Sequence, residues 1–391
     1  MKVRLGVAGL PTDIDSLAAI SEALDVSLVF MLDGQPEASD LPPGAEAVFI
    51  DADDGFDVLP VLKPLELAGV WVANGRYQRQ IGRVAEHLDW PRLPCCFGIP
   101  DGALPIPGAR IFTMDDFARV LEDGSDEILL PAWVRASCGD GDTSCMRVEH
   151  PSDLSLALEK LRKRNPDGVL RIQPAVKGAV YRLMAFKTGR DLVPFDVLEE
   201  TVTTSVYRVP LGMAMPLPAD GRLMDEMVSK AQEVNAVLPS GWGYVEMEFV
   251  ASEREVILTD VQAPARLGED LRTVVRLSRG VDLRLASMEC SLGRHPSLSP
   301  TRNTGVAFTW LLTRSGVVTG LEHVDSARTM PGVVEVHINA RPGDILSHVV
   351  DLPSRERGGF IVTEGDTAAI AMERLAAARE KVWITTSPAL S

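Results

Sequence analysis

Two β-like runs decide the fold of this chain, and they read Gly243-Tyr-Val-Glu-Met-Glu-Phe249 and Ile257-Leu-Thr-Asp-Val-Gln-Ala-Pro-Ala-Arg-Leu-Gly268. The polar turn Ala251–Arg254 lies between them. A polar turn between two apolar runs of strand length is typical of a β-hairpin. The pattern therefore predicts an antiparallel pair in which Gly243–Val250 lies beside Glu255–Val261.

Oxygen-bearing side chains gather on this predicted hairpin. Asp260 and Gln262 are two residues apart on one strand, so their side chains share a face of the sheet. Glu248 lies on the other strand, and Glu246 points to the same face, so either glutamate can join them. Carboxylate and amide oxygens suit a Mg²⁺ ion that bridges to phosphates. Arg266, which follows the second strand, would add a fork-shaped anion binder.

A glycine-containing loop lies far upstream, in Trp133-Val-Arg-Ala-Ser-Cys-Gly-Asp-Gly-Asp-Thr-Ser-Cys-Met-Arg-Val148. A predicted strand ends there at the cation Arg135, and Gly139 and Gly141 follow before a second strand begins. Free backbone amides in such a loop can fold over phosphates, and the cation can pair with one. The loop lacks the Gly-Lys-Ser/Thr ending of a Walker A loop.

These stretches, in this order, resemble the ATP-grasp family over essentially the whole chain. The loop resembles the biotin-carboxylase version, in which a strand-end lysine is followed by Ala-Ser, a run of glycines and Met-Arg-Val. Arg135-Ala-Ser137 and Met146-Arg-Val148 match that frame. Gln173-Pro-Ala-Val176, with Gly178 after it, resembles the family's adenine-contacting Glu-x-x-Val/Ile segment.

The hairpin and the C-terminal part extend this resemblance. Glu248-Phe249, then Asp260-Val-Gln262 and Arg266, resembles the family's metal and phosphate motif, Glu-Phe followed by Glu-x-Asn-x-Arg. Gly280-Val-Asp-Leu283 looks like the segment that follows this motif in many members. The glycine pattern of the C-terminal part resembles that of the closing domain of biotin carboxylase and the L-amino-acid ligases. Its glycines are Gly316, Gly332, Gly343 and those of Arg357-Gly358-Gly359-Phe360.

The resemblance implies an α/β protein of ATP-grasp type with four units. These would be an N-terminal α/β domain over residues 1–111, a lid with the glycine loop over 112–190, a central β-rich domain with the metal motif over 191–300, and a C-terminal α+β unit over 301–391. ATP would lie between the lid and the central domain. Relatives of this kind are commonly homodimers, which is an expectation for this chain as well.

The implied activity is ATP-dependent carboxylate–amine ligation through an acyl phosphate, with release of ADP. ATP and Mg²⁺ would be the cofactors, and the substrates would be a small carboxylic acid and an amine. The resemblance assigns the following roles: ATP binding to Arg135, Ser137, Gly139, Gly141, Gln173 and Val176, metal binding to Glu248, Asp260 and Gln262, and catalysis to Arg266.

Several positions depart from the family pattern. Arg135 replaces the usual lysine, which keeps the charge and changes its shape. Gln173 replaces a glutamate, and Arg266 lies two residues further on than usual. A second register is possible in the alignment with the family motif. It would put Gln262 at the position of the metal-binding glutamate and Pro264 at that of the asparagine, which would damage the metal site. These departures keep open an alternative function, a degenerate ATP-grasp protein that binds nucleotide or a partner without catalysis.

Composition and charge narrow the remaining possibilities. The 391 residues carry a formal charge of 39 − 55 = −16, which disfavours binding to a nucleic-acid backbone or to an anionic membrane surface. An apolar run long enough to span a membrane is missing from the sequence. The five cysteines form no disulfide framework, which favours a reducing compartment, with the cytoplasm as the default. Two further alternatives are a nucleotide-independent sugar or amino-acid binding protein and an oxidoreductase that uses the N-terminal sheet. The missing glycine fingerprint of dinucleotide binding argues against the oxidoreductase.

Hydrophobic periodicity predicts the remaining elements. Strands are expected at Val3–Ala8, Val26–Leu32, Ala47–Ile50, Gly69–Ala73, 127–134, 168–176, 179–187, 191–198, 201–209, 305–313, 333–338 and 359–364. Helices are expected at Ile14–Leu24, Arg79–Leu88, Met114–Leu121, Ser152–Arg164, Arg222–Leu238, Leu271–Arg279 and Thr367–Glu380. Residues 93–112 are expected to form a linker and Pro210–Pro218 a loop.

Overall fold

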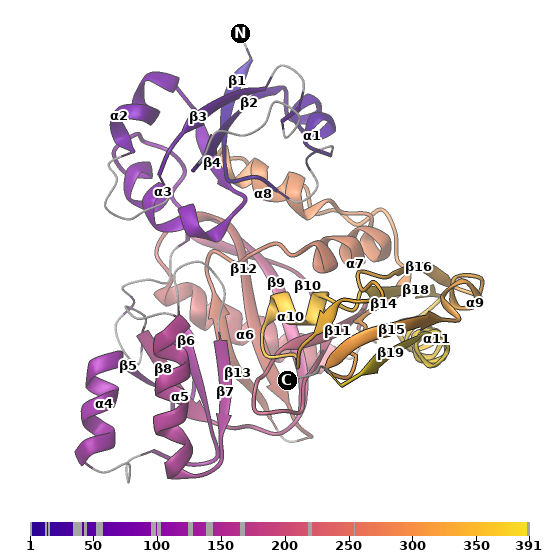
Figure 1. The fold of residues 1–391 in the computed structure, drawn as a ribbon. Helices are drawn as coiled ribbons and strands as arrows, with labels where there is room; N and C mark the ends of the chain where they lie inside the picture. The colour runs from indigo at the N-terminus through magenta and orange to yellow at the C-terminus, as the bar shows by residue number, and fades with distance from the viewer. Residues whose placement is uncertain are drawn as a thin grey trace.

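The strands of the protein form four sheets within the part of the chain that the computed structural model describes (Figure 1). The described part is residues 2–388 without 12, 13, 15, 34–40, 43, 44, 52–57, 95–98, 100–102, 124–127, 138–143, 165–168, 218–220 and 254. None of the helices in this part is both long enough and apolar enough to cross a membrane.

The N-terminal sheet is parallel, with the strand order β3-β2-β1-β4. Its elements are β1 (Val3–Ala8), α1 (Ser16–Leu24), β2 (Val26–Leu32), β3 (Glu46–Phe49), α2 (Leu59–Leu62), β4 (Gly69–Val72) and α3 (Gln78–Ala85). This agrees with the predicted alternation of strands and helices. The chain adds β2 and β3 on one side of β1 and then crosses to β4 on the other. The carboxyl ends of β1 and β4 therefore form a topological switch point, where parallel sheets commonly bind ligands.

A second, antiparallel sheet has the order β5-β8-β6-β7 and is called the lid sheet below. Its elements are β5 (Arg110–Thr113), α4 (Met114–Asp123), β6 (Ala132–Ser137), β7 (Ser144–Val148), α5 (Pro151–Arg164) and β8 (Val169–Pro174). Both helices cover one face, where Val134 and Ile172 are buried against them. Side chains alternate along a strand, so Arg135 and Gln173 point away from the helices.

The largest sheet is antiparallel and has the order β13-β12-β9-β10-β11-β14-β18-β16. Its strands are β9 (Ala179–Gly189), β10 (Asp191–Val202), β11 (Pro210–Met215), β12 (Gly241–Ala251), β13 (Val256–Gln262), β14 (Gly305–Trp310), β16 (Val333–His337) and β18 (Phe360–Gly365). The predicted hairpin is present as β12 and β13. Strands from both sides of the predicted boundaries at 190 and 300 contribute to this one sheet.

Helices cover the two faces of the large sheet. On one face α6 (Gly221–Val237) packs against Val245 and Met247 of β12. On the other face α7 (Glu269–Arg279) and α8 (Leu283–Ser291) pack against Tyr244 of the same strand. Glu246 and Glu248 alternate with the residues that face α6, so they lie on the Tyr244 face.

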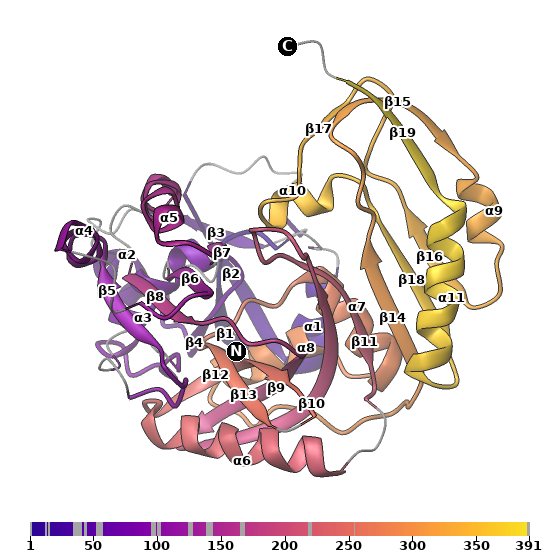
Figure 2. The same cartoon turned by 90° about the horizontal axis from the view of Figure 1, so that it is seen from below.

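A small fourth sheet, β17-β15-β19, lies beside the end of the large sheet (Figure 2). The C-terminal elements are β15 (Gly316–Glu322), α9 (Val324–Arg328), β17 (Ile345–Leu346), α10 (Leu352–Glu356), α11 (Ala368–Lys381) and β19 (Trp383–Ser387). Ala371 of α11 packs on β11 and β14 through Ala214 and Ala307.

Four sequence-based predictions are wrong. The strand expected at 201–209 is missing, because β10 already ends at Val202 and the next strand, β11, occupies Pro210–Met215 in the expected loop. Proline is tolerated at the first residue of a strand, and Met213 and Met215 after it are buried in the core. The strand expected at 127–134 begins only at Ala132, after Pro131. The expected linker 93–112 contains most of β5.

Candidate functional site

A cavity of about 720 Å³ lies where the N-terminal sheet, the lid sheet, the large sheet and the C-terminal elements meet. The carboxyl edge of the N-terminal sheet contributes Asn74, the lid sheet contributes Arg135, and the hairpin contributes Glu248. Arg266 follows the hairpin, and Trp310 closes the C-terminal side. The cavity therefore contains the topological switch point and part of the set of residues that the sequence singled out, whereas Asp260 and Gln173 are not among its lining residues.

Arginines from the lid sheet reach the carboxylates of the hairpin. Arg135 Nη2 lies 2.6 Å from Glu248 Oε1, and Arg135 Nη1 lies 3.3 Å from Asp260 Oδ2. Arg171 of β8 also pairs with Asp260. From the segment before β11, Arg208 Nη2 lies 3.2 Å from Glu248 Oε2. The two carboxylates predicted to bind metal are thus surrounded by three guanidinium groups.

These carboxylates stay ionised although they are buried. Burial alone would raise the pKa of Glu248, but Arg135 and Arg208 hold it below its ordinary value. Burial likewise opposes ionisation of Asp260, yet Arg171 and Arg135 hold the pKa of that carboxyl well below its usual range. Nearby positive charge favours the carboxylate form of an acid. The site therefore keeps two negative charges at neutral pH.

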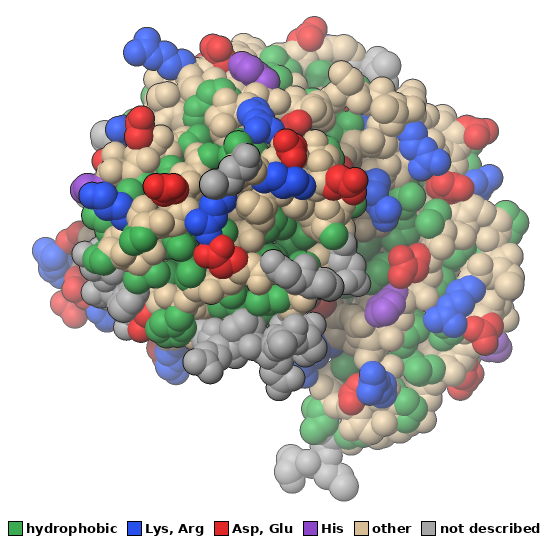
Figure 3. All heavy atoms as spheres, turned by 90° about the horizontal axis from the view of Figure 1, so that it is seen from above, with side chains coloured by type: hydrophobic (Ala, Val, Ile, Leu, Met, Phe, Trp, Pro, Cys, Tyr) green, Lys and Arg blue, Asp and Glu red, His purple; other side chains and the backbone are tan. Residues whose placement is uncertain are grey.

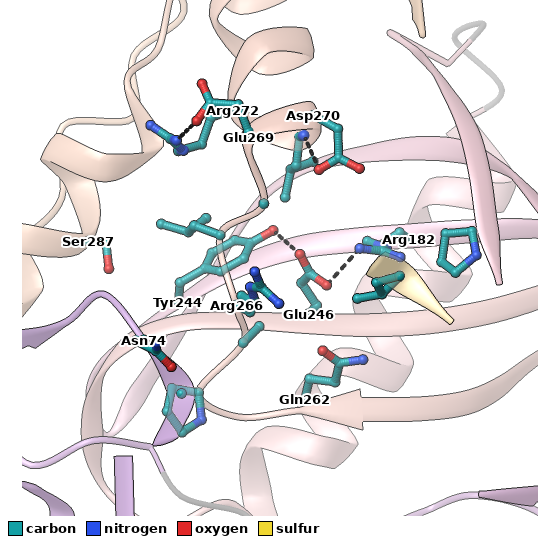
Figure 4. Close-up of a pocket in the computed structure, with 18 of the residues that line it drawn as sticks. Asn74, Arg182, Tyr244, Glu246, Gln262, Arg266, Glu269, Asp270, Arg272 and Ser287 are labelled. Atoms are coloured by element: carbon teal, nitrogen blue, oxygen red, sulfur yellow. Dashed lines mark hydrogen bonds and ion pairs between the residues drawn. The ribbon is translucent and has the colours of Figure 1, made fainter. Parts of the chain in front are cut away.

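The neighbouring acids on the same face behave differently. Arg182 of β9 pairs with both Glu246, at 2.9 Å, and Glu200 of β10. Tyr244 Oη donates to Glu246 Oε1 at 2.8 Å, as the dashed lines in Figure 4 indicate. Burial raises the pKa of Glu200 to about 7 and raises that of Glu246, with Arg182 opposing both shifts. Because one arginine pairs with two buried acids, their negative charges are only partly compensated.

The face of the lid sheet that carries Arg135 also presents polar atoms without partners. Gln173 is 2% exposed, and its Oε1 accepts no hydrogen bond from the described residues. Trp133, directly across from Gln173 in the sheet, is buried, and its Nε1 likewise has no acceptor among them. The guanidinium of Arg208 lies 5.3 Å from the centre of the Trp133 ring. A buried acceptor beside a buried donor and a flat ring suits a purine base.

Arg266 lines the cavity and is exposed within it. Figure 4 places it between Tyr244 and Glu246 in the middle of the cavity. No ion pair joins Arg266 to another residue of the described part of the chain, whereas Arg182 and Arg272 are both paired with acids. Arg266 is thus available to bind an anionic ligand.

Comparisons with known proteins bear on the fold. Residues 309–387 match the family model described as L-amino acid ligase C-terminal domain 2. An L-amino acid ligase from Bacillus licheniformis has a similar structure, with a TM-score of 0.77 and 14% identity over 99% of this chain and 100% of that one. A carboxyaminoimidazole ribonucleotide synthase from Aspergillus clavatus, crystallised with ATP, superimposes with a TM-score of 0.66. Its identity is 14% over 98% of this chain and 99% of that one. The protein has the ATP-grasp fold.

Two further relatives extend the comparison. Phosphoribosylglycinamide synthetase from Anaerococcus prevotii superimposes with a TM-score of 0.67 and 13% identity, over 98% of this chain and 100% of that one. An uncharacterized protein, y4rH, from Sinorhizobium fredii is 23% identical over 331 residues, which is 77% of this chain and 67% of that protein. The ATP-grasp fold therefore spans nearly the whole chain.

The remaining ATP-grasp predictions concern the lid loop and its surroundings. Gly139 and Gly141 lie outside the described residues, and so does the side chain of Ser137, the last residue of β6. Val176 is half-buried just after β8. The assignment of these residues to ATP binding stays a prediction.

Sequence reasoning missed two cations that pair with the hairpin carboxylates. Arg171 is two residues before Gln173 on β8, so strand alternation alone would have placed both on one face. Arg208 gave no usable signal, because it lies in the segment that was wrongly predicted to be a strand. Arg182, a basic residue of β9, faces two acids rather than solvent.

The donor set of the hairpin has the chemistry of a magnesium site. Glu248 lies directly across from Asp260, and Glu246 across from Gln262. Gln262 Nε2 donates to Asp260 Oδ2 at 3.4 Å, so Gln262 and Asp260 do share a face. All four oxygens of Glu248 and Asp260 contact arginines, so an ion bound there would compete with these arginines. The described residues contain no cluster of three or more His, Cys, Asp or Glu suited to a metal.

Surface charge is mixed on the face seen in Figure 3. Lysine and arginine side chains alternate there with aspartate and glutamate, and basic groups do not gather into one area. The charged groups that converge lie in and beside the cavity instead, which favours a small-molecule ligand.

Proposed function

We propose that the protein is an ATP-dependent carboxylate–amine ligase that forms an amide or peptide bond through an acyl phosphate. A carboxylate oxygen of one substrate would attack the γ-phosphorus of ATP, and ADP would leave. The amine of the second substrate would then attack the acyl carbon, lose a proton and displace phosphate. The observation that carries the proposal is that Arg135 and Glu248 line one cavity of an ATP-grasp fold, with Asp260 paired to Arg135 beside it.

The adenine end of the nucleotide would lie beside β6 and β8 of the lid sheet. Gln173 Oε1 would accept a hydrogen bond from the purine amino group, since this oxygen is buried and has no partner among the described residues. Trp133 would supply a flat apolar wall. Val176 and the loop with Ser137, Gly139 and Gly141 complete the proposed ATP-binding set.

The phosphate end would lie between the lid sheet and the hairpin. Arg135 would bind phosphate oxygens, since its fork-shaped guanidinium suits them. A magnesium ion held by Glu248, Asp260 and Gln262 would neutralise charge on the transferring phosphoryl group. Phosphoryl and acyl transfer depend mainly on such positioning and charge stabilisation.

Arg266 would act at the reacting end of the cavity. It faces the cavity without an ion-pair partner in the described structure, so its charge is available to the developing oxyanion or to the phosphoryl group. Removing one preorganised donor of this kind lowers kcat by about 10²- to 10³-fold in known enzymes. The same loss is expected for Arg266→Ala.

The test is ADP release from ATP and Mg²⁺ with pooled amino acids and small carboxylic acids. The pools follow from the match of residues 309–387 to a domain of L-amino acid ligases. We expect release that depends on the pool and is abolished in Glu248→Ala and Arg266→Ala. Arg276→Ala is the control, because Arg276 is an exposed residue of α7 that does not line the cavity. Equal rates in all four proteins would refute the assigned roles.

A second candidate is a nucleotide-binding protein without ligase activity. The observation that favours it is that every oxygen of Glu248 and Asp260 is engaged by an arginine. This candidate predicts measurable ATP binding without ADP release in any pool. Isothermal titration calorimetry beside the release assay separates the two.

A further inference from the structure

Ion pairs join the lid sheet to the hairpin across the space assigned above to the phosphates. Arg135 and Arg171 come from the lid sheet, while Glu248 and Asp260 come from the large sheet. All four side chains are at most 14% exposed. Arg208 adds a third cation, with its side chain 5% exposed. Both carboxylates of this network thus have guanidinium partners without any ligand, and the network carries one more positive than negative charge.

A buried network of this kind sets a condition on what can bind. A triphosphate without metal would draw the arginines to itself and leave Glu248 and Asp260 buried beside its own negative charges. A divalent cation alone would draw the carboxylates and leave Arg135, Arg171 and Arg208 buried without anions. Either state leaves uncompensated buried charge, which is strongly unfavourable. Only both ligands together provide every charge with a partner.

We propose that Arg135, Arg171 and Arg208 exchange their carboxylate partners for phosphate oxygens when nucleotide and divalent cation enter together, and that neither ligand binds well alone. The inference rests on the proposed ATP binding and adds Arg171 and Arg208 to its phosphate-binding residues. No side chain changes its charge in the exchange. The three guanidinium groups bind phosphate oxygens, and the two carboxylates bind the cation.

A separate observation supports the exchange. The Nε atoms of Arg135, Arg171 and Arg208 are all buried and have no hydrogen-bond acceptor in the described part of the structure. Each of these guanidinium groups therefore has a spare donor. Buried donors are rarely left without partners, and phosphate oxygens are the acceptors that suit arginine best.

The first test measures ATP binding by isothermal titration calorimetry with excess Mg²⁺ and with EDTA. For the wild type we expect binding in EDTA to be weaker by about 100-fold, within the range of strong coupling between two ligands. Asp260→Asn removes the competing anion, so it should bind metal-free ATP about tenfold more tightly than the wild type does. A requirement for the metal as a ligand of ATP alone predicts no such gain. Asp196→Asn is the matched control, since Asp196 is a buried acid of the same sheet that pairs with Arg279.

The second test uses the metal alone and needs no catalysis. Arg171→Met removes one of the cations that hold Asp260, so Mg²⁺ without nucleotide should raise the melting temperature of this variant and not that of the wild type. This arm also covers the case in which Asp260→Asn does not fold.

Three results would overturn the exchange. These are wild-type binding of ATP in EDTA within threefold of that in Mg²⁺, no gain in metal-free affinity in a folded Asp260→Asn, and no response of Arg171→Met to Mg²⁺. If the wild type binds ATP in neither buffer, the proposed function fails together with the exchange. A requirement for Mg²⁺ without the predicted changes in the variants refutes the exchange and leaves the proposed function standing.

Discussion

Glu200 is a buried acid whose charge the fold supports poorly, and neutralising it should stabilise the protein above neutral pH. Its side chain is 0% exposed and shares Arg182 with Glu246. Its Oε2 accepts no hydrogen bond from the described residues. Replacement by glutamine keeps the shape of the side chain and removes the charge, so Glu200→Gln isolates the cost of ionisation.

The size of the effect follows from the pKa of Glu200. Burial raises that pKa from 4.5 to about 7 in the folded protein. At about 1.4 kcal/mol for each tenfold change in proton affinity, the difference corresponds to about 3 kcal/mol. The folded state binds the proton more tightly than the unfolded state, so the free energy of unfolding falls as pH rises. The loss begins near the unfolded pKa and is complete above the folded one.

Urea unfolding at several pH values between 5 and 8 measures the prediction. We expect wild type and Glu200→Gln to be of similar stability at pH 5, and the variant to become more stable by up to about 3 kcal/mol at pH 8. The raised pKa of Glu246 affects both proteins and cancels in the difference. Glu199→Gln serves as the control, because its side chain points to the opposite face of β10. A stability difference between Glu200→Gln and wild type that stays constant from pH 5 to 8 would refute the reasoning.

Three further changes test the fold and the proposed nucleotide site. Gly178→Ala should lower the free energy of unfolding by about 1–3 kcal/mol in urea, because a Cβ there would lie 2.2 Å from the backbone oxygen of Ala251. Gly221→Ala, which has open space at the start of α6, should cost nothing, and equal effects would contradict the steric argument. Gln173→Leu should weaken ATP binding roughly five- to tenfold in calorimetry with Mg²⁺, and unchanged affinity would remove Gln173 from the site. Thr113→Ala should cost about 1 kcal/mol in urea unfolding, because Thr113 Oγ1 accepts from the backbone of Asp116 at 3.0 Å, and a loss below 0.3 kcal/mol would contradict this cap.

Local patterns in the sequence predicted much of the fold. The first two strands agree with the structure at both ends, because apolar runs bounded by polar turns leave little choice of boundary. The hairpin of β12 and β13 was predicted for the same reason. Strand β11 was missed because prolines at Pro210 and Pro216 resemble the ends of a loop, whereas burial in the large sheet decides its conformation.

The site was predictable only in part, because its contacts connect distant parts of the chain. Strand alternation could place Glu248, Asp260 and Gln262 on one face of a hairpin. It could not show that Arg135, 113 residues before Glu248, donates to that glutamate. Nor could it show that Arg208 approaches the same carboxylate from the segment before β11. Such pairs depend on how the sheets pack, which sequence periodicity does not encode.

The packing of the sheets also bears on the two registers of the hairpin motif. Both cross-strand pairs, Glu246 with Gln262 and Glu248 with Asp260, are in register, so the backbone alone does not choose between them. Their partners differ. Glu246 is held by Arg182 within its own sheet, whereas Glu248 and Asp260 are held by Arg135 of the lid sheet. A cation that bridges phosphates must lie where lid and hairpin face each other. This favours the register with Glu248 and Asp260, because these carboxylates already attract positive charge across that space.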